Sequence, residues 1–250
     1  MLDNTFKAIV VEETSKGLFK QSIKSRNISD LPDGDILVKV KYSSLNYKDG
    51  LSFYGNKGVS SNYPHTPGID AMGSVKSSNT PNIKIGSKVI VSGYDLGMNT
   101  AGGFGQYIRV PQEWISILPE GLDSLDSMII GTAGLTAGLC VNSIELLNHI
   151  DGSKAIVTGA TGGVGCIAVK LLSKLGAEVT AITGKNSSEG FLRSIGASRI
   201  MIRDHFISTV KKPMGKAIWD IAIDVAGGNL LSGVIASMKY DGVVTCCGLV

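Results

Sequence analysis

The residues of this chain that could do chemistry gather around a glycine-rich stretch, residues 154–177, which reads KAIVTGATGGVGCIAVKLLSKLGA. A short apolar run at residues 155–158 predicts a strand that is buried on both faces. Four glycines follow: Gly159, Gly162, Gly163 and Gly165. Apolar residues then recur at helical spacing from Val164 onward. A strand, a glycine turn and a helix in this order direct free backbone N–H groups at one point, which suits a pyrophosphate. The alternative is an ordinary glycine-rich turn without a ligand.

The residues after the next predicted strand indicate which dinucleotide would bind. That strand, residues 178–182, is followed by Thr183-Gly184-Lys185-Asn186-Ser187. In an NAD site, an Asp or Glu at the end of this strand binds the ribose hydroxyls, whereas Glu178 opens the strand here. Lys185 would instead attract a 2′-phosphate, because a charge-assisted hydrogen bond contributes about 1.5–3 kcal/mol. We therefore predict NADP(H), held in part by Thr183, Lys185, Asn186 and Ser187. If Lys185 is only a solvated loop lysine, the choice between NADPH and NADH stays open.

The elements that must position these residues differ between the two halves of the chain. Up to about Gly121, apolar or alternating segments separated by Gly, Pro and Asn turns predict a small barrel-like domain, with one helix at residues 47–54. The predicted strands of this half are 6–11, 36–45, 71–76, 88–92, 107–110 and 115–118.

From about Leu125 the pattern changes to alternating helices and strands. A helix at residues 125–147 precedes the strand that begins near Ala155. Further strands are predicted at 178–182, 199–202, 218–225 and 243–247. Such alternation indicates a parallel sheet with helices on both faces. The predicted fold class is therefore α/β, with a β-rich domain at residues 1–124 and a doubly wound, Rossmann-type nucleotide-binding domain at 125–250.

The carboxyl-terminal pattern ends in or just after the fifth predicted strand of the second half, at Val250. A six-stranded dinucleotide fold needs another helix and strand. We expect the sequence to be a fragment that lacks its carboxyl-terminal part. A reduced five-stranded variant is the alternative.

Composition excludes several classes of protein. The net charge is only +3, and no Lys/Arg cluster alternates with aromatic residues, which argues against a nucleic-acid partner. The amino terminus carries early charges and no long apolar segment, so we predict neither a secretory signal nor a membrane span. Four cysteines, Cys140, Cys166, Cys246 and Cys247, form no CxxC pair. Reduced, buried thiols in a cytoplasmic protein are the expected state.

Several motifs in a fixed order resemble the medium-chain dehydrogenase/reductase superfamily over essentially all 250 residues. The motifs are SSLNYKDGL (43–51), YPHTPGIDAMGSV (63–75), GSKVIVSGYDLG (86–97), GGFGQYIRV (102–110), IIGTAGLTAGLCV (129–141) and VTGATGGVG (157–165). Together they are most similar to the zinc-independent quinone oxidoreductase branch, and within it to the acrylyl-CoA reductase subgroup. The resemblance implies a GroES-like amino-terminal domain and a homodimer.

The chain departs from the zinc alcohol dehydrogenases of this superfamily at their metal ligands. Those enzymes place a Cys in the segment that here reads Asn46-Tyr47-Lys48-Asp49, and a His-Glu pair where this chain has Ile69-Asp70. Catalytic zinc requires three protein ligands. His65 alone does not supply them, and its structural interpretation is a turn residue before Pro67. We therefore predict no metal site, and reduction of a conjugated acceptor rather than oxidation of an alcohol.

The resemblance implies hydride transfer from a nicotinamide to the β-carbon of an α,β-unsaturated thioester, or to a quinone. An acceptor of this type becomes enolate-like, so donors near its oxygen are required. By resemblance, Asn46 and Tyr47 face the nicotinamide, and Tyr47 would contact the cofactor, donate to the enolate oxygen or relay a proton. The alternative for Tyr47 is packing at the barrel rim.

The resemblance also implies further cofactor contacts. Thr132 and Thr136 would hold the carboxamide, or else cap the helix. The loop residues Gly162, Gly163, Val164, Gly165 and Cys166 would bind the pyrophosphate, the last four through their backbone amides. The remaining positions are Arg203 near the adenosine, and Gly248 and Leu249 beside the nicotinamide.

Other classes remain possible for such a chain. The loop also fits the TGxxxGxG pattern of short-chain dehydrogenases, but some 150 residues precede it and Tyr240 is followed four residues later by Val244 instead of Lys. A non-catalytic NADPH-binding protein is the second hypothesis. NADPH oxidation with acryloyl-CoA, an enone and a quinone distinguishes an acyl-CoA reductase, a quinone reductase and a binding protein.

Overall fold

The computed structural model describes residues 4–210 and 216–248. The chain divides into two compact units, Met1–Thr132 (unit 1) and Ala133–Val250 (unit 2). The predicted domain boundary at 124/125 lies eight residues before this division, and both positions fall in or beside one helix, α2 (Ser124–Glu145). The boundary of the functional domains therefore stays a prediction.

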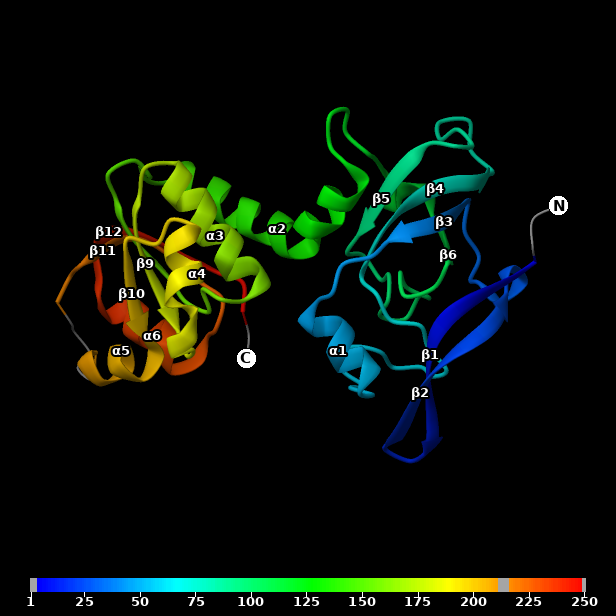
Figure 1. The fold of residues 1–250 in the computed structure, drawn as a ribbon, viewed down its shortest axis with the longest axis horizontal. Helices are drawn as coiled ribbons and strands as arrows, with labels where there is room; N and C mark the ends of the chain where they lie inside the picture. The colour runs from blue at the N-terminus through cyan, green and yellow to red at the C-terminus, as the bar shows by residue number, and fades with distance from the viewer. Residues whose placement is uncertain (1–3, 211–215, 249–250) are drawn as a thin grey trace. The chain divides into compact units, whose positions relative to one another are not determined.

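Unit 1 is built from antiparallel strands (Figure 1). One sheet has the order β6-β3-β4-β5-β7, and β1 and β2 form a separate two-stranded sheet. The strands are β1 (Thr5–Ser15), β2 (Leu18–Asn27), β3 (Ile36–Tyr42), β4 (Asp70–Ser78), β5 (Lys88–Ser92), β6 (Tyr107–Val110) and β7 (Ser116–Ile117). The helical segments are η1 (Ile28–Asp30), α1 (Tyr47–Phe53) and η2 (Gln112–Trp114).

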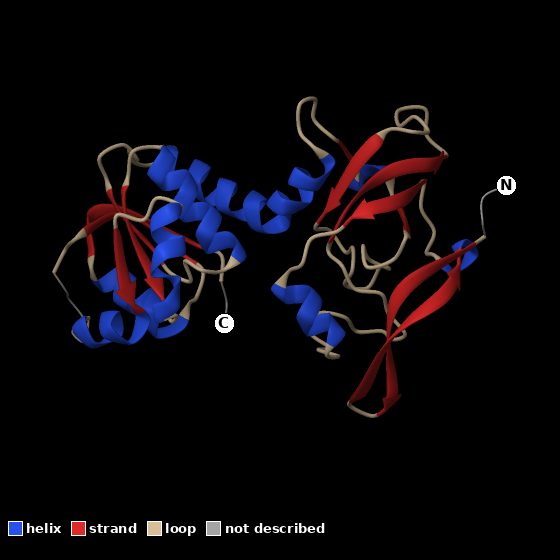
Figure 2. Cartoon of the chain, viewed as in Figure 1, coloured by secondary structure: helices blue, strands red, loops and turns tan. Residues whose placement is uncertain are grey.

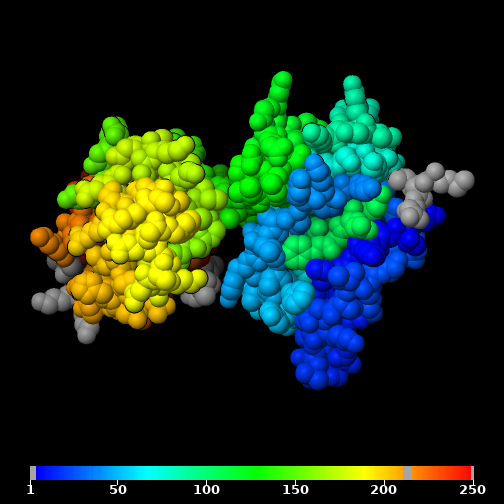
Figure 3. Space-filling model, in the orientation of Figure 1, coloured from blue at the N-terminus to red at the C-terminus, as the bar shows by residue number. Residues whose placement is uncertain are grey.

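The alternating strands of unit 1 bury one face each. Val38, Val75 and Val89 are buried in one apolar cluster between β3, β4 and β5. The prediction missed β2, because Leu18 and Ile23 are exposed and the strand contains few apolar residues. The β1–β2 hairpin forms the dark-blue projection of unit 1 in Figure 3.

Unit 2 contains a parallel five-stranded sheet in the order β10-β9-β8-β11-β12. Chain order within this sheet is therefore 3-2-1-4-5, which is the doubly wound arrangement. The strands are β8 (Lys154–Val157), β9 (Glu178–Thr183), β10 (Arg199–Ile202), β11 (Trp219–Asp224) and β12 (Met238–Cys246). The other helical segments are α3 (Gly163–Lys174), η3 (Asn186–Ser188), α4 (Glu189–Ser194), α5 (Arg203–Thr209) and α6 (Gly228–Ala236).

Two apolar clusters cover the two faces of this sheet. Ala155 and Val157 of β8 pack in one cluster with α3, α4 and the second half of α2, whereas Ile156 packs in the other with α5 and α6. This alternation explains why the strand reads as a continuous apolar run. Figure 2 shows the strands of this sheet in red and the helices that cover it in blue. The predicted α/β fold class, with a β-rich part followed by a doubly wound, Rossmann-type part, is confirmed.

Among the described residues, α2 is long and apolar enough to cross a membrane by length and composition alone. Its packing is that of a core helix, because Ala137, Val141 and Ile144 are buried in the apolar cluster of unit 2. The helix is also interrupted at Gly131, where φ is 48° and ψ is −159°. The expectation of buried thiols is confirmed for Cys140 and is wrong for the others, because Cys166 is half-buried and Cys246 and Cys247 are exposed.

Candidate active site

The glycine loop after β8 leaves no room for a side chain at Gly165, which follows it in α3. Gly159 has a φ of +56°, and its carbonyl accepts a hydrogen bond from the Gly162 amide at 2.9 Å. A Cβ on Gly165 would lie 2.2 Å from the Gly159 carbonyl oxygen. Any larger residue at Gly165 would therefore push the first turn of α3 away from the loop.

The start of α3 presents a small set of backbone donors. Gly162 is the N-cap, so the amides of Gly163, Val164 and Gly165 have no acceptor within the helix. The Cys166 amide donates to the Gly162 carbonyl at 2.9 Å. The predicted set of anion-binding amides is thus narrowed to three, and Cys166 makes the first hydrogen bond of the helix instead. These donors lie at the positive end of the helix dipole, which favours a bound anion.

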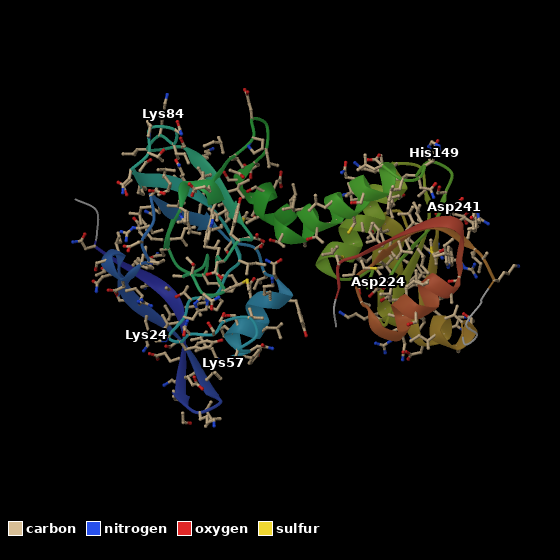
Figure 4. All side chains as sticks on the ribbon, turned by 180° about the vertical axis from the view of Figure 1, so that it is seen from behind. Lys24, Lys57, Lys84, His149, Asp224 and Asp241 are labelled. Atoms are coloured by element: carbon tan, nitrogen blue, oxygen red, sulfur yellow. The ribbon has the colours of Figure 1, made fainter. Side chains whose placement is uncertain are left out.

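A buried carboxylate holds the loop against β11. Thr158 Oγ1 donates to Asp224 Oδ1 at 2.6 Å and accepts the Val225 amide at 2.9 Å, while Asp224 Oδ2 accepts the Gly227 amide at 2.7 Å. Both Thr158 and Asp224 have no exposed surface. Figure 4 shows Asp224 at the end of the sheet opposite to His149, which precedes β8. Sequence reasoning missed Asp224, although a carboxylate at the end of an apolar strand was a visible signal.

The predicted adenosine-side residues follow the carboxyl ends of β9 and β10. Thr183 is buried, and its hydroxyl oxygen accepts the Lys185 amide at 3.0 Å. Lys185, Asn186 and Ser187 are exposed. Arg203 begins α5 directly after β10, and its guanidinium carbon lies 3.8 Å from the position of a Cβ on Gly184. The structure thus brings Arg203 to the loop that carries Lys185, so two cations border one turn.

The predicted nicotinamide-side positions after β12 are only partly described. A Cβ on Gly248 would lie 1.9 Å from the Val225 carbonyl oxygen, so the chain after β12 approaches the loop after β11 closely. Leu249 lies outside the described residues. Their roles toward the cofactor stay predictions.

In unit 1, the predicted catalytic residues stand at the start of α1. Asn46 is the N-cap, and Tyr47 is the first helical residue, with 73% of its surface exposed. The Asn46 side chain donates from Nδ2 to Ser44 Oγ at 2.8 Å and to Asp70 Oδ2 at 3.0 Å. Asn46 is therefore a member of a polar network, whereas the ring of Tyr47 is largely open to solvent. The catalytic roles of both residues stay predictions.

Asp70, the first residue of β4, is the centre of this network. Its carboxylate accepts hydrogen bonds from Ser44 Oγ, from Asn46 Nδ2, and from Thr132 through both the amide (2.9 Å) and Oγ1 (2.6 Å). The residue has no exposed surface. Burial by itself raises the pKa of Asp70, but the hydrogen bonds from Ser44 and Thr132 outweigh burial and leave the pKa below its usual value. Asp70 is thus an ionised acceptor that orients three donor residues.

A second buried carboxylate, Asp49, fixes α1 to β4. Its oxygens accept the amides of Asn46 and Ile69, each at 2.8 Å. Burial raises the pKa of Asp49, and the neighbouring charge of Asp70 acts in the same direction, while the two amides oppose them. From the sequence, Asp70 is noted only because Ile69-Asp70 stands where the zinc alcohol dehydrogenases have a His-Glu pair. Neither Asp70 nor Asp49 was predicted to be a site residue.

The break in α2 lets the helix approach Asp70. A Cβ on Gly131 would lie 2.9 Å from Asp70 Oδ2, and Thr132 begins the helical turn that follows. Thr132 is thus oriented by Asp70 through two hydrogen bonds. Thr136, one turn further along, is half-buried. The prediction that both threonines hold a carboxamide is not tested by these contacts.

In the part of the chain that the structure describes, no three His, Cys, Asp or Glu side chains lie close enough together to hold a metal ion. His65 is buried and shares a hydrogen bond between Nε2 and the Gly97 carbonyl at 2.8 Å. Burial lowers the pKa of His65, and the Gly97 hydrogen bond opposes this. The structural interpretation of His65 therefore agrees with its contacts.

Two family models match the chain in the order of its units. Residues 32–120 match the alcohol dehydrogenase GroES-like domain, and residues 163–250 match the model described as zinc-binding dehydrogenase. Acrylyl-CoA reductase AcuI of Ruegeria pomeroyi is 41% identical over 246 residues, which are 98% of this chain and 74% of that protein. YhfP of Bacillus subtilis, whose name suggests a quinone oxidoreductase, is 38% identical over 250 residues, covering 99% of this chain and 75% of YhfP.

Solved structures agree with these matches. The crystal structure of the Salmonella enterica yhdH oxidoreductase in complex with NADP has a TM-score of 0.92 and 43% identity, over 97% of this chain and 74% of that chain. The structure of Bacillus subtilis yhfP with NAD bound has a TM-score of 0.93 and 37% identity, over 98% of this chain and 74% of that chain. The chain therefore belongs to the medium-chain dehydrogenase/reductase superfamily, in the branch of the acrylyl-CoA reductases and quinone oxidoreductases, and it is an oxidoreductase.

Proposed function

We propose that this protein uses NADPH to reduce the carbon–carbon double bond of a short enoyl-CoA of the acryloyl-CoA type. The observation that carries the proposal is the carboxyl edge of the sheet in unit 2. There, three amides that have no acceptor among the described residues begin α3, and two cations follow the next two strands. The 41% identity to an acrylyl-CoA reductase supports the choice of substrate.

The residues of unit 2 fit a phosphorylated dinucleotide. The loop has no Cβ at Gly163 or Gly165, so an anion can reach the amides of residues 163–165. Lys185 and Arg203 would bind a 2′-phosphate on the adenosine ribose through charge-assisted hydrogen bonds. When bound, the reduced nicotinamide supplies a hydride. Thr158 and Asp224 do not contact the cofactor in this proposal. They hold the glycine loop in the shape that exposes its amides before the cofactor binds.

The residues of unit 1 would stabilise the acceptor as it gains negative charge. An enolate oxygen requires donors aimed at the place where charge develops. Tyr47 offers an exposed hydroxyl, and Asn46 is oriented by Ser44 and Asp70. We propose Tyr47 as the donor to the enolate oxygen and Asp70 as a positioning residue that acts through Asn46 and Thr132.

A panel of acceptors tests the proposed reaction. NADPH oxidation is followed at fixed protein concentration with acryloyl-CoA, a simple enone and a quinone. The proposal expects the largest kcat/KM with acryloyl-CoA. Turnover with the quinone alone would assign the protein as a general quinone reductase, which is the second candidate and has the 38% identity to YhfP in its favour. Tight NADPH binding without turnover on any acceptor would identify a non-catalytic NADPH-binding protein.

The cofactor preference has its own test in Lys185→Ala. Loss of one charge-assisted hydrogen bond should raise the KM for NADPH about tenfold and leave the KM for NADH nearly unchanged. Lys174→Ala, an exposed lysine at the opposite end of α3, is the matched control and should change neither constant. An unchanged preference in Lys185→Ala would remove this lysine from the site, and the NAD bound to Bacillus subtilis yhfP makes that outcome informative.

We also propose a homodimer, on the family resemblance, and a cytoplasmic location, on four cysteines that form no CxxC pair. Light scattering of the purified protein measures the mass directly, and a monomer at micromolar concentration would refute the dimer.

A further inference from the structure

A partly open cavity lies in unit 2 at the amino end of β11, away from the glycine loop. It has a volume of about 220 Å³ and lies between β10, α5, the start of β11 and the end of α6. The apolar side chains that border it are Met201, Phe206, Val210, Ile218 and Trp219. Trp219 begins β11 and Asp224 ends it, so the cavity and the cofactor loops are separated by about 16 Å of strand.

Trp219 carries a donor that the fold leaves unused. The residue is 4% exposed, and its indole Nε1 has no hydrogen-bond partner among the described residues. A buried N–H without an acceptor is destabilising, and such groups in native proteins are rare. An acceptor that is not part of the described chain would remove this cost.

The other polar side chains at the cavity are already engaged or exposed. The Thr209 hydroxyl donates to the Phe206 carbonyl at 2.7 Å. The Ser237 hydroxyl donates to the carbonyls of Gly233 and Val234 at 2.7 and 3.0 Å. Lys216 borders the cavity but is exposed to solvent. The indole N–H is therefore the buried donor that remains for a ligand.

The size of the space limits the ligand. A cavity of about 150 Å³ with apolar walls holds a benzene molecule. The cavity here accommodates one six-membered ring with a short substituent. The walls favour an apolar ring, and the indole N–H requires an acceptor atom on that ring or its substituent.

We propose that this cavity binds a small single-ring molecule that bears one hydrogen-bond-accepting oxygen, with Trp219 Nε1 as the donor. The site is separate from the proposed cofactor and substrate groups, so the inference does not rest on the proposed function.

Fluorine NMR of protein labelled with 5-fluorotryptophan tests the proposal on the folded protein. The sequence has two tryptophans, and Trp114 stacks on Tyr94 in unit 1, outside the cavity, so its resonance is an internal control. Acetophenone supplies a ring with a carbonyl oxygen, and ethylbenzene supplies nearly the same shape without an acceptor. We expect acetophenone to shift the Trp219 resonance saturably, with ethylbenzene binding about fivefold more weakly.

Each other outcome refutes the proposal. An unresponsive Trp219 resonance means that the donor is satisfied by water only. Equal shifts of both tryptophans mean non-specific association, and equal affinities for the two probes mean that Nε1 plays no part. Trp219→Phe removes the reporting resonance, so binding of the two molecules to this variant is followed by NMR of the ligands themselves, and the preference for acetophenone should be abolished. If that variant does not fold, Val210→Phe retains Trp219 and fills the space, and it should abolish binding of both molecules.

Discussion

Asp70 of unit 1 and Asp224 of unit 2 both have no exposed surface, and the two carboxylates have different partners. Asp224 of unit 2 accepts two hydrogen bonds within the described chain, from Thr158 and from the Gly227 amide, and so fixes the backbone of two loops. Asp70 of unit 1 accepts four, from Ser44, Asn46 and Thr132. A buried charge is stable only where donors surround it. The comparison shows that Asp224 joins two loops through one hydroxyl and one amide, whereas Asp70 gathers mainly side-chain donors.

The largest effect is expected for Asp70→Ala. Removing the carboxylate leaves the donors of Ser44, Asn46 and Thr132 without their acceptor, and we expect unit 1 to lose about 3–5 kcal/mol of unfolding free energy. A urea titration of 5-fluorotryptophan protein reports unit 1 through Trp114 and unit 2 through Trp219. The Trp114 transition should move to lower urea, and equal movement of both would show that the network does not stabilise unit 1 specifically.

A smaller loss is expected for Asp224→Ala. Two hydrogen bonds are lost instead of four, so unit 2 should lose about 2–3 kcal/mol, seen in the Trp219 transition. NADPH affinity should fall as well, because the glycine loop loses its attachment to β11. Thr158→Ser keeps the hydroxyl and should retain affinity, whereas Thr158→Val should behave like Asp224→Ala. A loss in unit 2 as large as that of Asp70→Ala in unit 1 would break the comparison.

The pH dependence of the stability of unit 1 tests whether Asp70 is ionised in the folded protein. Its pKa is lower in the folded protein than the value of about 3.9 for an unfolded chain, so its contribution to stability is present above about pH 4 and is lost as the pH falls through the folded pKa. Asp49 has a raised pKa and acts in the opposite direction, so a matched variant is needed. Between about pH 5 and pH 3 the wild type should lose more stability than Asp70→Asn. Parallel melting curves for the two proteins would show that Asp70 is not ionised in the fold.

The smallest effect is expected for an exposed ion pair of unit 1. Lys24 Nζ lies 2.6 Å from Glu12 Oε2, and both side chains are partly exposed. Water and salt screen such a pair, so Lys24→Ala should change the unfolding free energy by about 0.5 kcal/mol or less. A loss comparable to that of Asp224→Ala would show that charge alone, without burial, accounts for the contribution of Asp70 and Asp224 to the unfolding free energy.

Local sequence pattern was sufficient for most of the elements. The predicted strands at residues 88–92, 107–110 and 199–202 coincide with β5, β6 and β10. The glycine loop was readable because it follows an apolar strand and precedes an amphipathic helix. The prediction failed for β2, because none of its residues is buried and its few apolar residues, among them the exposed Leu18 and Ile23, do not alternate with polar ones over the strand.

The two aspartates were not identified, because their partners are distant in sequence. Asp70 lies 62 residues from Thr132, and Asp224 lies 66 residues from Thr158. A carboxylate inside an apolar run, as in IDAM or AIDV, marks both positions, but it does not say which donors will surround them. Similarly, Arg203 was linked to the adenosine by resemblance, whereas its position beside Gly184 depends on the pairing of β9 with β10.

The amino-acid sequence by itself determined the order of the two units, the dinucleotide loop and the family, because these depend on periodicity and glycine spacing over short stretches. Only the tertiary structure decided that Asp70 organises Asn46 and Thr132, that the Cys166 amide is engaged, and that the Trp219 indole lacks an acceptor. The physical reason is that a buried polar group is defined by its hydrogen-bond partners, and folding brings those partners together from distant parts of the chain.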